Sequence, residues 1–151
     1  LDSVRQVMNV PMLRGEWGAF YATDSSVLPA GDVIVKTLEQ LRCGEIYWSY
    51  FNSLDKMDYF PLINRAYPAA VAGTLQEFHY DRQKMNLEIA WENDPDVTAP
   101  TIIYFPLPPY QIKVSGSTGP YIVRKNDKNS AWIILKNIPG SSVRKLLISR
   151  K

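Results

Sequence analysis

The stretch PMLRGEWGAF, residues 11–20, is a short apolar run that ends in a carboxylate and then breaks at glycines and aromatic residues. This pattern is typical of a buried parallel strand of an α/β barrel that delivers a catalytic acid at its C-terminal end. Gly15 and Gly18 would let the backbone pass close to its neighbours and turn away above the barrel. We therefore expect Glu16 at the mouth of a barrel. A turn that carries a solvated glutamate is the alternative, because short motifs often match by chance.

Arg14 stands two positions before Glu16 in the same run. Simple strand alternation would put both side chains on one side of the strand. Arg14 is then either a cation that helps to keep the carboxylate ionised or the mark of a bulge that interrupts the alternation. We favour the first reading, because burying an unpaired arginine would be costly.

The sequence on both sides of this stretch alternates between helix and strand patterns. Residues 1–10 have the apolar spacing of an amphipathic helix, and Pro11 blocks its continuation. A second helical pattern runs from Pro29 to about residue 42, with Gly44 placed to cap it, and the aromatic-rich run 45–51 follows as a strand. The order of strand, helix and strand predicts a parallel pair of strands with a right-handed crossover.

From Thr74 onward the pattern changes to short alternating strands between turn-forming residues, after a connection over residues 52–72. Several short strands at this spacing predict an antiparallel β-sandwich. Its aromatic residues, such as Phe78, Trp91, Tyr104 and Trp132, are expected in the core, with a sugar-binding platform as the alternative. The expected strands cover residues 75–80, 86–91, 101–105, 111–115, 121–125, 131–136 and 143–149.

The fold class is therefore an α/β fragment followed by an all-β antiparallel sandwich. We expect residues 1–73 to form the last two strand–helix units of a (β/α)8 barrel and residues 74–151 to form the sandwich. A complete barrel needs about 250 residues, so we expect the chain to be the C-terminal part of a longer enzyme.

Composition excludes several classes of protein and site. The 151 residues carry a net charge of only +2, so nucleic acid is not expected as a partner. No apolar run reaches the roughly 18 residues of a transmembrane helix, and the first residues do not have the charged-then-apolar pattern expected of a leader peptide. Cys43 is the single cysteine and His79 the single histidine, which argues against disulfides, cysteine zinc clusters and histidine-based triads. We expect no metal and no cofactor, and a small buried hydrophobe at Cys43.

Three motifs together resemble the C-terminal part of endoglycoceramidases and related glucosylceramide-type β-glycosidases of glycoside hydrolase family 5. They are GEWG at residues 15–18, YWSY at residues 47–50, and RAYPAAVAG at residues 65–73, which leads into the predicted sandwich. The last motif is the most specific, and the resemblance covers essentially the whole chain.

The resemblance implies a retaining β-glycosidase with Glu16 as nucleophile and Trp48 beneath the sugar next to the scissile bond. A retaining enzyme also needs an acid/base carboxylate about 5–5.5 Å from the nucleophile. The resemblance places that glutamate on an earlier barrel strand, outside these residues. Glu39, on the outer helix, and Glu45, at the wrong end of its strand, do not replace it. We therefore expect the isolated chain to be inactive.

The implied substrate is a glycosphingolipid or another β-glycoside, which in the lipid case lies in a membrane surface, and the implied compartment is extracellular. Two alternatives stay open. The sandwich could be a non-catalytic module that binds carbohydrate or lipid, or the enzyme could have lost its activity. The small residues of the stretch 65–73 suit a stiff seam better than a free linker, which favours a sandwich that supports the barrel.

Overall fold

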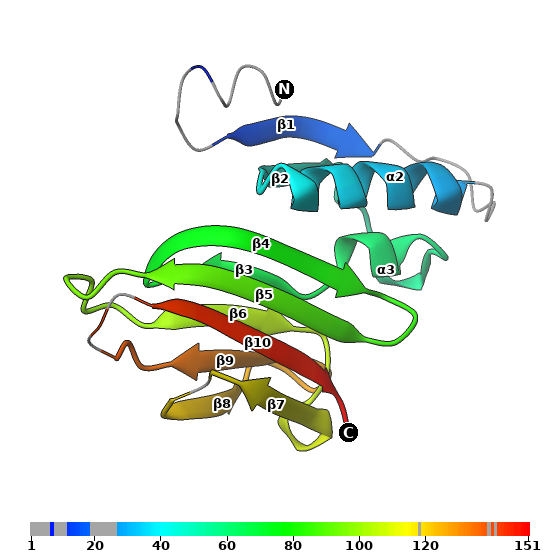
Figure 1. The fold of residues 1–151 in the computed structure, drawn as a ribbon. Helices are drawn as coiled ribbons and strands as arrows, with labels where there is room; N and C mark the ends of the chain where they lie inside the picture. Colours follow the sequence, from blue (N-terminus) through cyan, green and yellow to red (C-terminus); the bar gives the residue numbers. More distant parts are fainter. Residues whose placement is uncertain (1–6, 8–11, 19–26, 118, 139, 141) are drawn as a thin grey trace. The chain divides into compact units, whose positions relative to one another are not determined.

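The computed structural model describes residues 7, 12–18, 27–117, 119–138, 140 and 142–151. The chain forms two compact units, Leu1–Asn64 and Arg65–Lys151, which we describe separately (Figure 1). Within the described residues, no helix is both long enough and apolar enough to span a membrane.

The first unit contains the predicted strand, helix and strand. Strand β1 (Leu13–Gly18) pairs in parallel with β2 (Gly44–Trp48), and α2 (Val27–Gln40) lies between them in sequence. The short helices η1 (Leu54–Lys56) and α3 (Phe60–Ile63) follow within the stretch that was expected to be a plain connection. The parallel pair and the helix between the strands are thus confirmed, while the helix expected over residues 1–10 lies outside the described residues apart from Val7.

The core of the first unit joins its strands to its helices. Trp17 of β1, Val35 of α2 and Leu62 of α3 are buried in one apolar cluster, against which Tyr47 of β2 packs. At Gly31 of α2, a Cβ atom would overlap the end of the Leu62 side chain, so a larger residue there would require this leucine to move. Cys43 is also buried, as expected.

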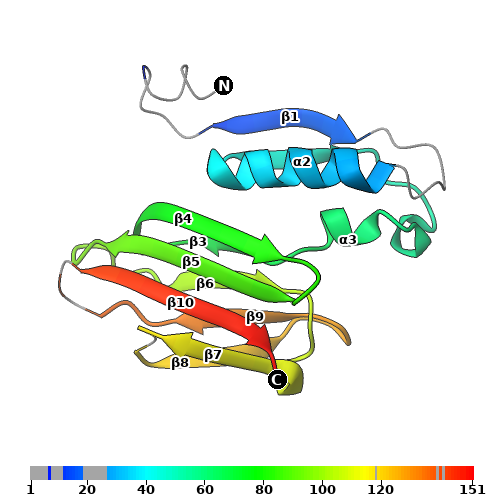
Figure 2. The same ribbon diagram turned by 45° about the vertical axis from the view of Figure 1, so that its right-hand side comes forward.

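The second unit is a β-sandwich of two antiparallel sheets with four strands each (Figure 2). One sheet has the strand order β4-β5-β10-β7 and the other the order β3-β6-β9-β8. The predicted sandwich and its seven predicted strands are confirmed, and β3 is an additional strand. The strands are β3 (Tyr67–Ala70), β4 (Gly73–Asp81), β5 (Asn86–Asn93), β6 (Thr101–Phe105), β7 (Ile112–Gly116), β8 (Tyr121–Lys125), β9 (Ala131–Leu135) and β10 (Val143–Arg150), with the short helix η2 (Pro109–Gln111) before β7.

The face of the strand on which an aromatic side chain lies decides whether it enters the sandwich core. Trp91 is buried as predicted, and Phe78 packs against the core from a half-buried position. For Tyr104 and Trp132 the prediction of a core position is wrong, since both are half-buried on the outer side of their sheet. Their neighbours along β6 and β9 occupy the inward positions, and successive residues of a strand point to opposite faces.

Strand β3 escaped prediction because its sequence, YPAA, lacks strand-forming side chains apart from its tyrosine. It pairs with β6 through an irregular register that shifts between Pro68 and Ala70. Ala66 and Ala72, on either side of it, are 0% and 1% exposed. The backbone N–H of Ala72 donates a hydrogen bond of 3.0 Å to Oγ1 of Thr101. The stretch 65–73 is therefore part of the second compact unit.

Candidate active site

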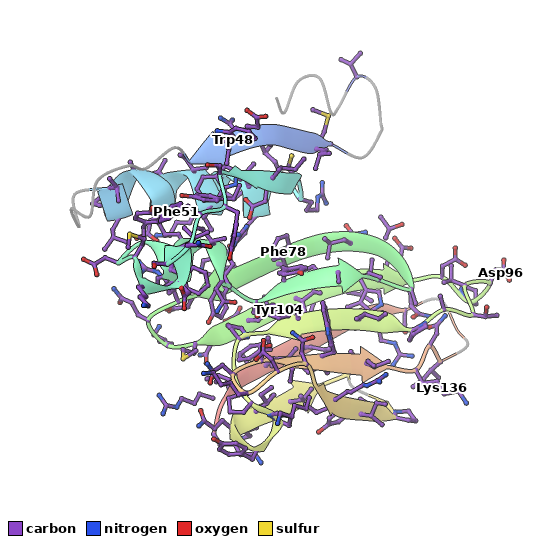
Figure 3. The ribbon with its side chains drawn as sticks, turned by 180° about the vertical axis from the view of Figure 1, so that it is seen from behind. Trp48, Phe51, Phe78, Asp96, Tyr104 and Lys136 are labelled. Carbon is purple, nitrogen blue, oxygen red and sulfur yellow. The ribbon has the colours of Figure 1, made fainter. Side chains whose placement is uncertain are left out.

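Glu16 and Trp48, the candidate nucleophile and sugar-binding residue, lie at the C-terminal ends of two neighbouring parallel strands. Glu16 pairs with Ile46, and Gly18 pairs with Trp48. Because the strands run in the same direction, their C-terminal ends meet at one edge of the pair. Glu16 is exposed, and Trp48, labelled in Figure 3, is 50% exposed, so both side chains are accessible.

The residues next to these two anchor the site. Trp17 follows Glu16 and is only 4% exposed, and Tyr47 precedes Trp48. The rings of Trp17 and Tyr47 meet edge to face, with their centroids 5.4 Å apart and their planes at 86°. Since alternate side chains of a strand point to opposite faces, these anchors pack toward α2 and leave Glu16 and Trp48 on the other face. That is the face which the interior of a barrel would occupy.

Arg14 does not take the position expected from simple alternation. Arg14 pairs with Glu45, and Glu16 pairs with Ile46, so β1 holds one extra residue, Gly15, between two consecutive pairs. A β-bulge of this kind interrupts the alternation of side chains. The expectation of Arg14 as an interior cation beside Glu16 is therefore not supported, and the bulge, which was the alternative reading, is the one observed.

Two other carboxylates of the first unit are kept away from this edge. Glu39 lies in α2 and is 2% exposed. Glu45 is the second residue of β2, at the opposite end of the strand from Trp48. Neither side chain therefore has a position from which it could protonate a leaving group bound beside Glu16.

Two exposed aromatic residues near Trp48 were not assigned a role from the sequence. Tyr50 is 81% exposed and Phe51 is 39% exposed, both directly after the end of β2. The peptide bond between Trp48 and Ser49 is cis. The run of aromatic residues 47–51 predicted a strand, and its motif YWSY carried part of the family resemblance, but only Trp48 was expected to contact a sugar. Exposed aromatic side chains thus stand at the end of β2 and in the residues that follow it.

Comparison with known proteins places the chain among the glycoside hydrolases. The model of the glycoside hydrolase family 5 C-terminal domain matches residues 65–144. The chain belongs to this family, and the resemblance seen in the sequence is confirmed. No match was found among curated proteins.

Solved structures of related enzymes share the fold. Endo-glycoceramidase II from Rhodococcus sp. matches with a TM-score of 0.77 and 24% identity, over 99% of this chain and 35% of that protein. The lactosyl-enzyme intermediate of the same enzyme matches with a TM-score of 0.72 and 26% identity, over 99% and 35%. Sterylglucosidase 1 from Cryptococcus neoformans matches with a TM-score of 0.67 and 16% identity, over 94% and 28%. The chain therefore spans about a third of the length of the first listed enzyme structures.

Proposed function

We propose that this chain is the C-terminal part of a retaining β-glycosidase that hydrolyses glycosphingolipid-type β-glycosides. In this proposal the first unit, Leu1–Asn64, forms the end of a (β/α)8 barrel, and the second unit, Arg65–Lys151, is the sandwich. The observation that carries the proposal is the placement of Glu16 and Trp48 at one edge of a parallel strand pair, on the face opposite the helix. Active sites of α/β barrels lie at the C-terminal ends of the strands.

Glu16 would act as the nucleophile of a double displacement. Its carboxylate would attack the anomeric carbon and form a covalent glycosyl-enzyme, while the aglycone leaves as an alcohol after protonation by a second carboxylic acid. Water, activated by that second group, would then release the sugar and restore Glu16. The indole of Trp48 would cover the apolar C–H face of the sugar ring in the adjoining subsite.

The sugars and glycolipid bound in related structures support this proposal. One structure of the Rhodococcus enzyme is a lactosyl-enzyme intermediate, and another is a complex with ganglioside GM3. A glycosyl-enzyme is the covalent intermediate of a retaining mechanism. A ganglioside is a sugar chain on a ceramide, which is the substrate class that we propose here.

The acid/base carboxylate must come from elsewhere in the full enzyme. It would stand about 5–5.5 Å from Glu16 in a retaining site, and the positions of Glu39 and Glu45 exclude both. We therefore expect no turnover of a β-glycoside by the 151-residue chain alone.

Covalent trapping in the longer enzyme tests the proposal directly. A 2-deoxy-2-fluoro β-glycoside with a good leaving group forms a glycosyl-enzyme that hydrolyses slowly, so the peptide that contains Glu16 should gain the mass of the sugar. Glu16→Gln should abolish both the labelling and the turnover, because the amide is nearly the same size but carries no attacking charge. Glu45→Gln is the matched control, and the enzyme with this substitution should still be labelled at Glu16.

Labelling at a different carboxylate would show that the nucleophile assignment is wrong. Turnover with inversion at the anomeric carbon would contradict the retaining mechanism. If the longer protein binds β-glycosides but is neither labelled nor active, the alternative of a non-catalytic binding protein would be favoured.

A further inference from the structure

The outer side of the sheet β3-β6-β9-β8 carries two rows of side chains that cross all four strands and are apolar except for one arginine, and we call this surface the apolar face. The pairing register defines both rows, because directly opposed residues of neighbouring strands lie on the same face of a sheet. The first row consists of Tyr67, Tyr104, Trp132 and Arg124, and the second of Ala70, Ile102, Ile134 and Ile122.

The aromatic residues of the first row pack against one another. The rings of Tyr67 and Tyr104 are stacked with centroids 5.3 Å apart, and Tyr104 meets Trp132 at 5.3 Å with planes at 65°. The indole N–H of Trp132 donates a hydrogen bond of 3.0 Å to Oδ1 of Asn126 at the rim. Since each ring already covers part of its neighbour, this row offers little free ring face on which a sugar could stack.

The apolar face is nevertheless open to solvent. Ile122 is 61% exposed and Tyr67 is 39% exposed, and Arg124 is exposed beside Trp132. Antiparallel sheets that face water normally place polar side chains on the outer side. A continuous apolar surface on such a sheet indicates a partner.

The other sheet of the sandwich follows the normal rule. Its exposed side chains are mostly charged or polar, and they include Glu77, His79, Glu88, Glu92, Lys113 and Lys145. The apolar outer side is thus a property of one sheet and not of the sandwich as a whole.

The strands of the sheet that carries the apolar face hold charges of one sign only. Arg124 and Lys125 are the charged residues of the strands β3, β6, β8 and β9, all of which the structure describes, and these strands contain no acidic residue. Exposed Lys128 and Lys136 lie in the adjoining turns. The adjoining turns also hold the exposed acids Asp94, Asp96 and Asp127, so the excess of basic charge lies on the strands and not in the turns.

We propose that the apolar face docks on a lipid surface that carries anionic headgroups. Tyrosine and tryptophan side chains favour the boundary between headgroups and acyl chains, and basic residues at the rim attract anionic lipid. The inference rests on the proposed function, since a glycosphingolipid substrate resides in a lipid surface and the sandwich would hold the enzyme there.

Vesicle binding by the 151-residue chain tests this inference without a glycoside. The chain should co-sediment with vesicles of phosphatidylcholine that contain phosphatidylserine, and less with phosphatidylcholine alone or at high salt. Ile122→Glu should weaken the binding about tenfold or more, because it puts a negative charge into the docked surface. Arg124→Glu should remove the preference for phosphatidylserine.

Matched substitutions on the other sheet serve as controls. Val143→Glu changes a residue that is 54% exposed on β10, and Lys145→Glu reverses an exposed charge on the same strand. Neither should alter vesicle binding, and circular dichroism should show that all four variants are folded. The inference is overturned if the wild-type chain does not sediment with either vesicle, or if Val143→Glu weakens binding as much as Ile122→Glu.

Two further outcomes would assign the apolar face to another partner. Sedimentation velocity that shows a dimer dissolved by Ile122→Glu would identify a second copy of the chain as the occupant. Saturable binding of a soluble glycan, lost in the Trp132→Ala variant, would identify a sugar site. Either result, without vesicle binding, overturns the lipid proposal.

The readouts of this inference and of the proposed function are separate. The vesicles contain no glycoside, so binding does not require Glu16, and Glu16→Gln should leave it unchanged. Vesicle binding together with failed trapping at Glu16 would refute the glycosidase proposal alone. Successful trapping without vesicle binding would refute only the docking surface.

Discussion

Trp17 and Tyr47 meet edge to face across the parallel pair β1 and β2, with ring centroids 5.4 Å apart and planes at 86°. Each of these residues is the immediate neighbour of a candidate site residue, Glu16 in one strand and Trp48 in the other. The contact therefore connects the core of the first unit to the edge at which the two candidate residues lie.

Removing this contact should loosen the candidate site before it affects the sandwich. Trp17→Ala should cost about 3–5 kcal/mol, since the indole is buried and the surroundings can fill the cavity only in part. Hydrogen exchange should show faster exchange in β1 and β2, with unchanged protection in β5 and β9. The control Leu13→Ala, at a residue 64% exposed, should change little. Unaltered protection of β1 in Trp17→Ala would refute the anchoring role.

Trp48→Ala in the longer enzyme should weaken the binding of the sugar. A half-exposed indole that covers a sugar ring contributes binding in both the ground state and the transition state, so we expect KM to rise about tenfold with a smaller change in kcat. Trp48→Phe should restore part of the loss. Tyr110→Ala, which removes an aromatic side chain that is 72% exposed on η2, is the control. An effect on kcat alone would argue against a binding role.

Gly73→Ala should strongly destabilise the sandwich. Gly73 has φ +142°, and a Cβ atom there would overlap the carbonyl oxygen of Glu92 on the paired strand. We expect a loss of about 3 kcal/mol or more in the free energy of unfolding. The two possible causes are steric overlap and backbone strain, and Gly140→Ala separates them. Gly140 has φ +118°, but no atom lies near the position of an added Cβ. This substitution should therefore cost only about 1–2 kcal/mol. Equal losses, measured by urea unfolding, would show that backbone strain alone is responsible.

The start of the sandwich can be tested with two truncations. A fragment of residues 65–151 should unfold cooperatively and be more stable than residues 74–151. The longer fragment keeps β3, which pairs with β6, and the buried side chain of Ala66. Loss of β3 would leave the outer edge of β6 unpaired and prone to aggregation. Equal urea midpoints for the two fragments would instead place the domain boundary at residue 73, where the sequence motif ends.

Tyr80 should make the sandwich sensitive to alkaline pH. Burial raises the pKa of its phenol from 10 to about 12, against a smaller opposing effect of Arg82 and smaller reinforcing effects of Asp81 and Tyr104. The unfolded chain loses this proton near pH 10, whereas the folded chain keeps it until about pH 12. The contribution of Tyr80 to stability is therefore complete below pH 10 and is lost as the pH rises through this interval. Tyr80→Phe should flatten the fall in stability between pH 10 and 12, as measured by urea unfolding. An unchanged slope would assign the alkaline sensitivity to other groups.

The sequence by itself determined the elements whose local pattern is distinctive. The short runs of aromatic and branched apolar residues in β6 and β9, between turn-forming residues, predicted strands. The apolar spacing of α2 between two strand patterns predicted the parallel pair. The family resemblance likewise depended on short local motifs, and Glu16 and Trp48 were selected from them without knowledge of their distance in space.

Tertiary structure alone decided the features that depend on a partner strand. The bulge at Gly15 is defined by the pairing of β1 with β2. The sequence of β1 alone therefore could not show that Arg14 and Glu16 do not follow simple alternation. Strand β3 forms because β6 offers it a partner, although its proline and alanines have little preference for strands. Tyr104 and Trp132 lie outside the core because the opposing sheet covers the other face of their strands. The period of a strand distinguishes its two faces, but only the packing of the second sheet determines which face is buried.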